Sequence, residues 1–315
     1  MGCGVAISVG NQRGGRTDRK RPRRGFTLIE LLVVIAILGI LGALTFGALG
    51  TASGRGKADS SRNVVAMLSE AVLEHYETYE DLAMSKARDA AGVVDLRKRI
   101  REEMPDSWED VEPGANLDGL TAATSATTAA GRAYKSYKAS NSHSAAYAGA
   151  ECLYMIVTQS GLFPDFLANV PSKFVGDIDK DGAFEFWDGW GRPIAFIRWA
   201  PGAMPAVRRD ADTYHDPLDP YGTDATAFAL VPLVYSPGKD ESMNDPTGAV
   251  SGYGLLSQSA SGWADGLLGT VSAGSVTGNT PCTYRPDGAN LIGAPDPANP
   301  DAWRDNISNF DTLFK

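Results

Sequence analysis

The sequence predicts an α+β protein in which a long N-terminal helix, membrane-spanning at its start, continues into a globular domain with a helical insert and a small antiparallel sheet. Three observations support this class. Residues 31–54 contain no charged residue, an apolar stripe with helical spacing follows them, and the strand patterns come after residue 171. The chain is accordingly divided into residues 1–25 (basic leader), 26–54 (transmembrane helix), 55–83 (amphipathic continuation), 84–170 (helical insert with an Ala/Ser/Thr-rich excursion) and 171–315 (sheet, acidic loop and loop-rich tail).

The membrane-length segment begins beside a single acid. About 20 apolar residues span the hydrocarbon core of a bilayer as a helix, and residues 31–54 meet that length. Glu30 lies at the start of this helix, where an acid costs about 2.5–3.5 kcal/mol on insertion scales. Because a charge within a membrane span is retained only where it is paired or has a function, Glu30 is a candidate functional residue.

The leader is strongly basic, and its charge sets the orientation. Fewer basic residues follow the span, so the positive-inside rule places the N-terminus in the cytoplasm and the chain from about residue 55 outside the cytoplasmic membrane. The leader contributes a net charge of +6, so its removal changes the formal charge from −9 to −15. An acidic exterior argues against nucleic-acid binding and is compatible with calcium. The basic residues of the leader are Arg13, Arg16, Arg19, Lys20, Arg21, Arg23 and Arg24.

The residues at the junction carry a family resemblance. The segment Arg24-Gly25-Phe26-Thr27-Leu28-Ile29-Glu30, followed by an apolar run, resembles the signature of type IV pilins and type II secretion pseudopilins. The resemblance implies a pilin-like fold, cleavage by a prepilin peptidase between Gly25 and Phe26, and N-methylation of Phe26. It also implies that Glu30 faces the new amino group, on its own chain or on a neighbouring subunit. Since each charge is costly in lipid unless it is paired, processing would create a pair that holds subunits in register.

Two other interpretations of the N-terminus stay open. A secretory signal peptide also has a basic start and an apolar core, and Ala48-Leu49-Gly50 offers a weak cleavage site. A plain signal anchor is the second alternative. The uncharged stretch is longer than a usual signal core, and Glu30 is out of place in either, so the pilin-like interpretation is favoured.

The span is expected to continue as a helix to about Tyr79. Val65, Leu68, Val72 and Tyr76 recur at three- and four-residue spacing and form one stripe on a helix. In pilins, to which this pattern is similar, the first half of such a helix packs in the membrane or filament core. The second half buries its stripe against a sheet.

The middle of the chain predicts helices. Residues 80–112 are highly charged and predict a helix that ends near Pro105. Residues 116–150, rich in Ala, Ser and Thr, predict an inserted surface excursion with some helix. Residues 145–168 predict a second, buried helix.

Cysteine usage leaves two possibilities. Cys3 would leave with the leader, whereas Cys152 and Cys282 remain in an exported domain, where a disulfide is chemically permitted. The alternative is that Cys152 is a free thiol in the core.

Strand patterns come late in the chain. Residues 193–199 and 228–235 predict two strands, and Pro232 suggests an edge or a bulge in the second. Residues 201–226 are rich in Pro and Asp and predict a loop. The chain after Ser236 predicts mainly loops.

An acidic loop with metal-ligand spacing precedes these strands. Oxygen-bearing side chains occur at loop positions one, three, five, nine and twelve, and Gly182 takes the sixth position, where a sharp turn needs a permissive backbone. The spacing resembles EF-hand-type and dockerin-type calcium loops; a solvated acidic turn is the alternative. The predicted calcium ligands are Asp177, Asp179, Asp181, the carbonyl of Ala183, Glu185 and Asp188.

Two later segments add to the resemblance. Asp188-Gly189-Trp190-Gly191-Arg192-Pro193 resembles the Asp-Pro-Trp-Gly-x-Pro segment of major pseudopilins, with Gly189 in place of the proline. Residues 233–240 resemble the later strand and Ser-x-Gly-x-Asp turn of the same family, which implies a second calcium in the loop that follows. The candidate ligands there are Asp240, Glu241, Asn244 and Asp245.

Enzymatic motifs are absent from the sequence. His75, His143 and His215 show no zinc-site spacing, and there is no nucleophile elbow, P-loop or dinucleotide-binding fingerprint. We therefore expect a protein that is not an enzyme.

The resemblance implies a structural function. A pseudopilin stacks with other pilin-like subunits, on an inner-membrane assembly platform, into a type II secretion pseudopilus that supports protein export. Two alternatives stay open: a subunit of a surface type IV pilus for adhesion, motility or DNA uptake, and a membrane-tethered, calcium-dependent binding module. In the last case, residues 116–150 and 246–315 would carry the ligand contacts.

Overall fold

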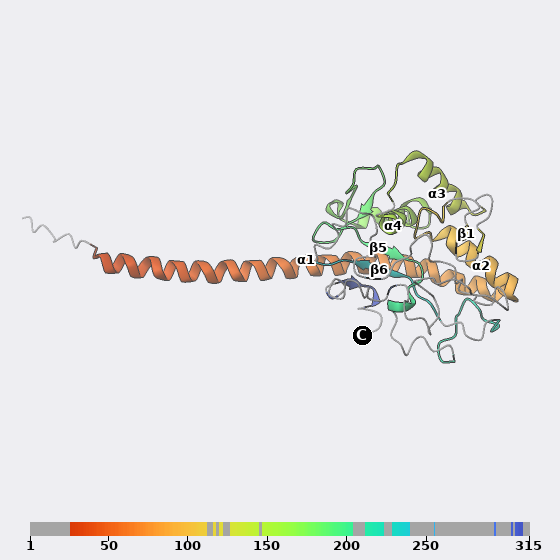
Figure 1. The fold of residues 1–315 in the computed structure, drawn as a ribbon, viewed down its shortest axis with the longest axis horizontal. Helices are drawn as coiled ribbons and strands as arrows, with labels where there is room; N and C mark the ends of the chain where they lie inside the picture. Colours follow the sequence, from red (N-terminus) through yellow and green to blue (C-terminus); the bar gives the residue numbers. More distant parts are fainter. Residues whose placement is uncertain are drawn as a thin grey trace, which may run out of the picture. The chain divides into compact units, whose positions relative to one another are not determined.

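The architecture is seen in a computed structural model (Figure 1). The chain separates into two compact units, one up to Ala52 and one from Ser53 onward. A long helix is followed by a globular part with helices and small antiparallel sheets, which confirms the predicted α+β class. The described residues are 26–111, 116–117, 120–121, 127–144, 147–203, 212–223, 229–239, 255, 293, 304 and 306–310.

The first unit is formed by the apolar half of α1 (Leu28–Lys86). Its large apolar side chains are exposed. The helix is long and apolar enough to cross a membrane. The hydroxyls of Thr45 and Thr51 donate to carbonyls one turn earlier, at 3.0 and 3.1 Å, so neither needs water as a partner. The helix therefore fits a single-pass membrane anchor.

The second half of α1 carries the predicted apolar stripe, and the stripe is buried. Val65 and Leu68 are 2% and 0% exposed. They belong to the hydrophobic core that also contains the residues of β5 (Ala195–Ile197) and most of β6 (Leu233–Ser236). The predicted helix is confirmed, and it continues to Lys86.

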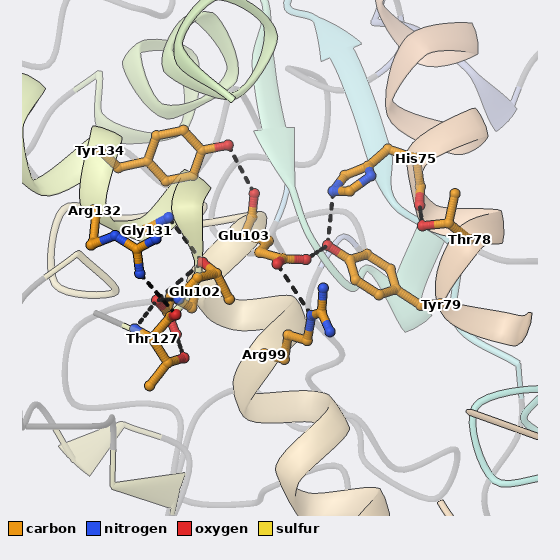
Figure 2. Close-up of polar contacts among 11 residues, drawn as sticks. His75, Thr78, Tyr79, Arg99, Glu102, Glu103, Thr127, Gly131, Arg132 and Tyr134 are labelled. Carbon is orange, nitrogen blue, oxygen red and sulfur yellow. Dashed lines mark hydrogen bonds and ion pairs between the residues drawn. The ribbon is translucent and has the colours of Figure 1, made fainter. Parts of the chain in front are cut away.

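Helix α2 (Ala90–Glu103) is the helix predicted in the charged segment, and it ends before Pro105 as expected. Figure 2 shows how its last residue joins α1. The Tyr79 hydroxyl donates to Glu103 Oε2 at 2.7 Å and lies 2.8 Å from His75 Nε2. The buried Tyr79–Glu103 hydrogen bond therefore ties the end of α2 to α1.

Helix α3 (Ala129–Ser140) is a helical part of the excursion predicted over residues 116–150, and one of its faces is packed instead of exposed. Tyr134 is 1% exposed and belongs to the core. The helix begins where Glu102 accepts hydrogen bonds from the amides of Thr127 and Thr128 at 2.6 and 2.8 Å (Figure 2). A composition rich in Ala, Ser and Thr therefore conceals a packed helix.

Helix α4 (Ala148–Gln159) is buried but shorter than the prediction of residues 145–168. Gly161 has a φ of +76°, a left-handed conformation that ends the helix. The short helix that follows has no buried residue, so the apolar residues beyond Gln159 do not extend the buried helix.

The main sheet has three antiparallel strands in the order β5-β6-β7, with β7 spanning Ile307–Ser308. β6 is therefore central, and the expectation that Pro232 marks an edge or a bulge is wrong. Pro232 lies before Leu233, the first paired residue, because proline has no N–H to donate to a ladder. The remaining short elements are β1 (Asn116–Leu117), β2 (Leu120–Thr121), α5 (Phe166–Asn169), η1 (Ser172–Phe174), β3 (Val175–Gly176), β4 (Glu185–Phe186) and η2 (Pro201–Ala203).

The chain end joins the sheet through Asn309, a contact that the sequence did not predict. The Asn309 amide donates to Val234 O, and its Oδ1 accepts from Val234 N, both at 3.1 Å. Its Nδ2 donates to Pro232 O at 2.8 Å. The tail after Ser236 was expected to be mainly loop, yet it returns to supply the third strand.

A buried cluster of ion pairs links the end of α2 to β5. Asp110 accepts from Arg101 Nε at 2.6 Å and from Arg198 Nη1 at 2.7 Å. Asp106 accepts from the Arg198 amide at 2.9 Å. All four side chains are at most 3% exposed, so each charge depends on its partners.

Candidate functional site

The start of α1 places Glu30 in a capping box. Thr27 precedes the first helical residue, and its Oγ1 accepts from the Glu30 amide at 3.3 Å. The Glu30 carboxylate in turn accepts from the Thr27 amide at 2.8 Å and from its hydroxyl at 2.9 Å. This reciprocal arrangement satisfies two N–H groups that a helix start leaves without partners.

The capping box adds a residue that sequence reasoning missed at this site. Glu30 was assigned to the new amino group of Phe26, whereas in the uncleaved chain its carboxylate is held by Thr27. The spacing Thr-x-x-Glu before an apolar helix was the signal. Phe26 is 81% exposed, and Gly25 lies outside the described residues.

The acidic loop connects a short hairpin. β3 and β4 pair antiparallel, with Gly176 opposite Glu185. Gly182 has a φ of +106°, so the predicted turn glycine is in the conformation that only glycine adopts readily. Asp177 accepts from the amides of Asp181 and Gly182 at 3.2 and 3.0 Å, which folds the loop around its own carboxylates.

The loop brings carboxylate oxygens together in two groups that share Asp179. Oxygens of Asp177, Asp179 and Asp181 all lie within 4.8 Å of one another. Oxygens of Glu151, Asp179 and Glu185 do the same. Three of the predicted ligands, Asp177, Asp179 and Asp181, thus form one group, and Glu185 joins Asp179 and Glu151 in the other.

Two oxygens in these groups are buried without a hydrogen bond. They are Asp181 Oδ2 and Glu185 Oε1. Burial raises the pKa of Glu185 to about 7, against the smaller lowering effect of the Ile178 amide. Burial also raises the pKa of Asp181. A buried acceptor without a hydrogen bond costs folding free energy, so these two oxygens are suited to coordinate a cation.

Asp188 is in neither group. Its Oδ1 accepts from the amides of Trp190 and Arg192 at 2.7 and 3.0 Å. Its Oδ2 accepts from Ser236 Oγ at 2.7 Å. Both Asp188 oxygens therefore hold the turn that follows to β6. Asp188, the twelfth residue of the predicted calcium loop, thus makes different contacts from the other acids of that loop. The remaining predicted ligand, Ala183, is fully buried and donates its amide to Asp181 Oδ1 at 2.8 Å.

Glu151 is a second residue that sequence reasoning missed. It lies in the first turn of α4 and is fully buried. Its carboxylate accepts from Trp108 Nε1 and, at 3.2 Å, from the Ser144 amide. Burial raises its pKa to about 8. A lone acid at the start of an otherwise apolar helix was the available signal.

The second predicted metal site and one cysteine of the predicted disulfide are not described by the structure. Asp240, Glu241, Asn244, Asp245 and Cys282 lie outside the described residues. Cys152 is a buried free thiol. None of the three histidines joins a metal-ligand group in the described part of the chain.

The histidines are held by local contacts instead. His75 binds Tyr79, and burial lowers its pKa to about 4. His143 packs against the ring of Trp108. His215 Nε2 lies 2.9 Å from the carbonyl of Asp219.

Comparison with protein families gives a match at the N-terminal end of the chain. Residues 20–46 match the model of the prokaryotic N-terminal methylation motif. No curated protein and no solved structure matches the chain. The matched residues contain the cleavage junction, Thr27, Glu30 and the first turns of α1. The chain therefore carries the signature of the type IV pilin and pseudopilin family at the start of its membrane-length helix.

Proposed function

We propose that this protein is a pseudopilin, a prepilin-peptidase-processed structural subunit of a type II secretion pseudopilus. The observation that carries the proposal is the methylation motif at residues 20–46, placed directly before a helix long enough to span a membrane. Such subunits are structural, which agrees with the lack of catalytic motifs in the sequence. Its partners would be the peptidase, other pilin-like subunits and an inner-membrane assembly platform.

The geometry of the helix start suits this role. Cleavage before Phe26 would place a cation one residue before Thr27, at the positive end of the helix dipole. That position is unfavourable for a cation unless an anion is near, and Glu30 is four residues after Phe26. Competition between the Thr27 donors and a neighbouring subunit's amino group for the Glu30 carboxylate would couple processing to assembly.

The segment Asp188–Pro193 supports the secretion branch of the family over the pilus branch. Its departure from the pseudopilin pattern, Gly189, has a structural reason. A Cβ at Gly189 would lie 2.8 Å from Lys57 Cα, too close for any side chain. The Gly189 amide also donates to Ser61 Oγ at 2.8 Å, which a proline could not do. The segment thus docks on α1 in a way that requires glycine.

Calcium would stabilise the globular unit at the acidic loop. Calcium takes six to eight oxygen ligands, and the loop supplies two groups of carboxylates that share Asp179, one with Asp177 and Asp181 and one with Glu185 and Glu151. The unsatisfied oxygens of Asp181 and Glu185 support this assignment. A bound divalent cation would balance the negative charge of these carboxylates. It would also connect the loop to α4 through Glu151.

Mass spectrometry of the N-terminus tests the proposed processing. The native chain, purified from membranes, is expected to begin at N-methylated Phe26. A Gly25→Leu variant should keep its leader, whereas a matched change in the apolar helix, Gly47→Leu, should be processed normally. A chain that starts near Thr51, or an uncut wild-type leader, would overturn the proposal.

A second measurement separates secretion from a surface pilus. Loss of the gene in its native host should abolish export of folded proteins and leave surface filaments intact. Loss of surface filaments with normal export would favour the type IV pilus instead.

A further inference from the structure

An open groove of about 490 Å³ lies in the second unit, between the first turns of α1 after Ser53, η1 and the loop Trp187–Gly191. Two lysines, Lys57 and Lys173, and two tryptophans, Trp187 and Trp190, line it. Both lysines are exposed and both tryptophans are partly buried. The other lining residues from α1 are Ser53, Gly56 and Ser60, which are small and keep the groove open.

The tryptophan loop is fixed on α1 and is not a free loop. The Gly189 amide binds Ser61 Oγ, and Ser61 is fully buried. Asp188 holds the amides of Trp190 and Arg192 and is itself bound by Ser236. The position of the aromatic side chains beside Lys57 is therefore built into the fold.

The charge of the groove is opposite to that of the chain. Of the residues that line it, Asp188 is the one acid, and both of its oxygens already accept hydrogen bonds. Lys57 and Lys173 leave a local excess of positive charge on a chain whose formal charge is −9. Lys173 Nζ also lies 4.6 Å from the centre of the Phe174 ring. The lysines can bind an anionic group, and the aromatic rings beside them can contact an apolar region next to it.

The sequence places one wall of this groove close to the end of the membrane-length run. The uncharged run ends at Gly54, and Lys57 follows three residues later on the same helix. At about 1.5 Å per residue, Lys57 is about 4.5 Å along the helix axis from the end of the run. Lys173, Trp187 and Trp190 line the same groove as Lys57. Tryptophan and lysine are the residue types that anchor proteins at the boundary between hydrocarbon and headgroups.

We propose that this groove binds the anionic phospholipid headgroups of the membrane in which α1 is inserted. The globular unit would then be held on the membrane surface before the subunit is assembled. This inference rests on the membrane insertion of α1, which the proposed function also uses, but not on cleavage or on filament formation. It therefore fails or holds independently of them.

The test uses the full chain, labelled with fluorotryptophan, at one chain per lipid nanodisc. Fluorine NMR signals are assigned with Trp187→Phe and Trp190→Phe variants. A lipid with a paramagnetic headgroup is included in discs of phosphatidylcholine, with or without phosphatidylglycerol. We expect the Trp190 signal to broaden when phosphatidylglycerol is present, while the buried Trp199 signal stays unchanged in the same sample.

Matched charge variants show whether the groove is responsible. Lys57→Glu combined with Lys173→Glu should reduce the broadening to its level in neutral lipid. Lys86→Glu combined with Lys135→Glu makes the same change of charge at exposed positions elsewhere. This control should leave the broadening of the Trp190 signal unchanged. All four lysines are exposed, so the variants are expected to fold, and near-ultraviolet circular dichroism checks this.

Three results would overturn the proposal. The first is a Trp190 signal that is equally broadened in neutral and anionic discs. The second is broadening that survives the Lys57/Lys173 double change. The third is a Trp190 shift in neutral discs on addition of free glycerol phosphate, which would assign the groove to a soluble phosphate ligand instead.

Discussion

Asp179 is the carboxylate shared by the two groups of acidic oxygens, so replacing it with asparagine should remove most of the calcium stabilisation. A ligand at about 100 times its dissociation constant stabilises the folded state by about 2.7 kcal/mol. For a unit of this size, each kcal/mol changes the melting temperature by about 2–4 °C, which predicts a calcium-dependent rise of about 5–10 °C for the wild type. If Asp179→Asn weakens binding about 100-fold, the remaining stabilisation is about 0.4 kcal/mol and the rise about 1 °C.

The assay is thermal unfolding of the full chain in detergent, followed by near-ultraviolet circular dichroism in calcium or in a chelator. Asp165→Asn makes the same chemical change at an exposed position and should keep the full calcium effect. Magnesium should substitute poorly, because it requires near-ideal octahedral geometry with shorter bonds. An equal rise in wild type and Asp179→Asn, or no rise in the wild type, would refute the calcium assignment.

Three further predictions concern the globular unit. Gly189→Ala should destabilise it by about 1–3 kcal/mol in chemical denaturation, because the added Cβ meets the α1 backbone, whereas Gly56→Ala has open space and should not. Asp110→Asn should cost about 3–5 kcal/mol, because Arg101 and Arg198 lose a buried counter-charge; Asp95→Asn, exposed on α2, is the control, and equal costs would contradict the role of the cluster. His75 has a pKa of about 4 when folded and about 6.5 when unfolded, so the unfolded chain binds more protons between these values and wild-type stability should fall as pH decreases through this window. His75→Gln should remove that part of the pH dependence, and an unchanged profile would show that other groups cause it.

Periodic patterns predicted the helices, and residue spacing predicted the site only in part. The stripe from Val65 to Tyr76 identified the buried face of α1, because one helix face repeats every three or four residues. The carboxylates of the 177–185 loop are neighbours in the chain, so their grouping was visible in the spacing. Glu151 lies on α4, 26 residues before Asp177 in the chain, and only tertiary packing brings it to the loop.

The differences from the sequence-based expectations have related physical causes. Asp188 has the spacing of a ligand, and its Oδ1 accepts from the Trp190 and Arg192 amides while its Oδ2 accepts from Ser236 Oγ, contacts that the spacing does not show. The strand at Ile307–Ser308 has two residues and no alternation to recognise, so pairing with β6 could not be predicted. Pro232 correctly indicated a residue without an N–H to donate to the sheet, but it lies at the start of a central strand instead of on an edge strand.

The hydrogen bonds between Asn309 and β6 bear on how the length of this chain can change, in engineering or in evolution. β6 ends at Ser236 and β7 begins at Ile307, so adjacent antiparallel strands close the intervening chain at both ends. The entropic cost of closing a flexible loop rises slowly, by about 0.6 kcal/mol for each doubling of its length. An insertion between the two strands, placed away from the buried Leu255, should therefore add little to the cost of closure. Truncation before Ile307 should not be tolerated, because it removes β7 and leaves the buried Val234 amide without its partner.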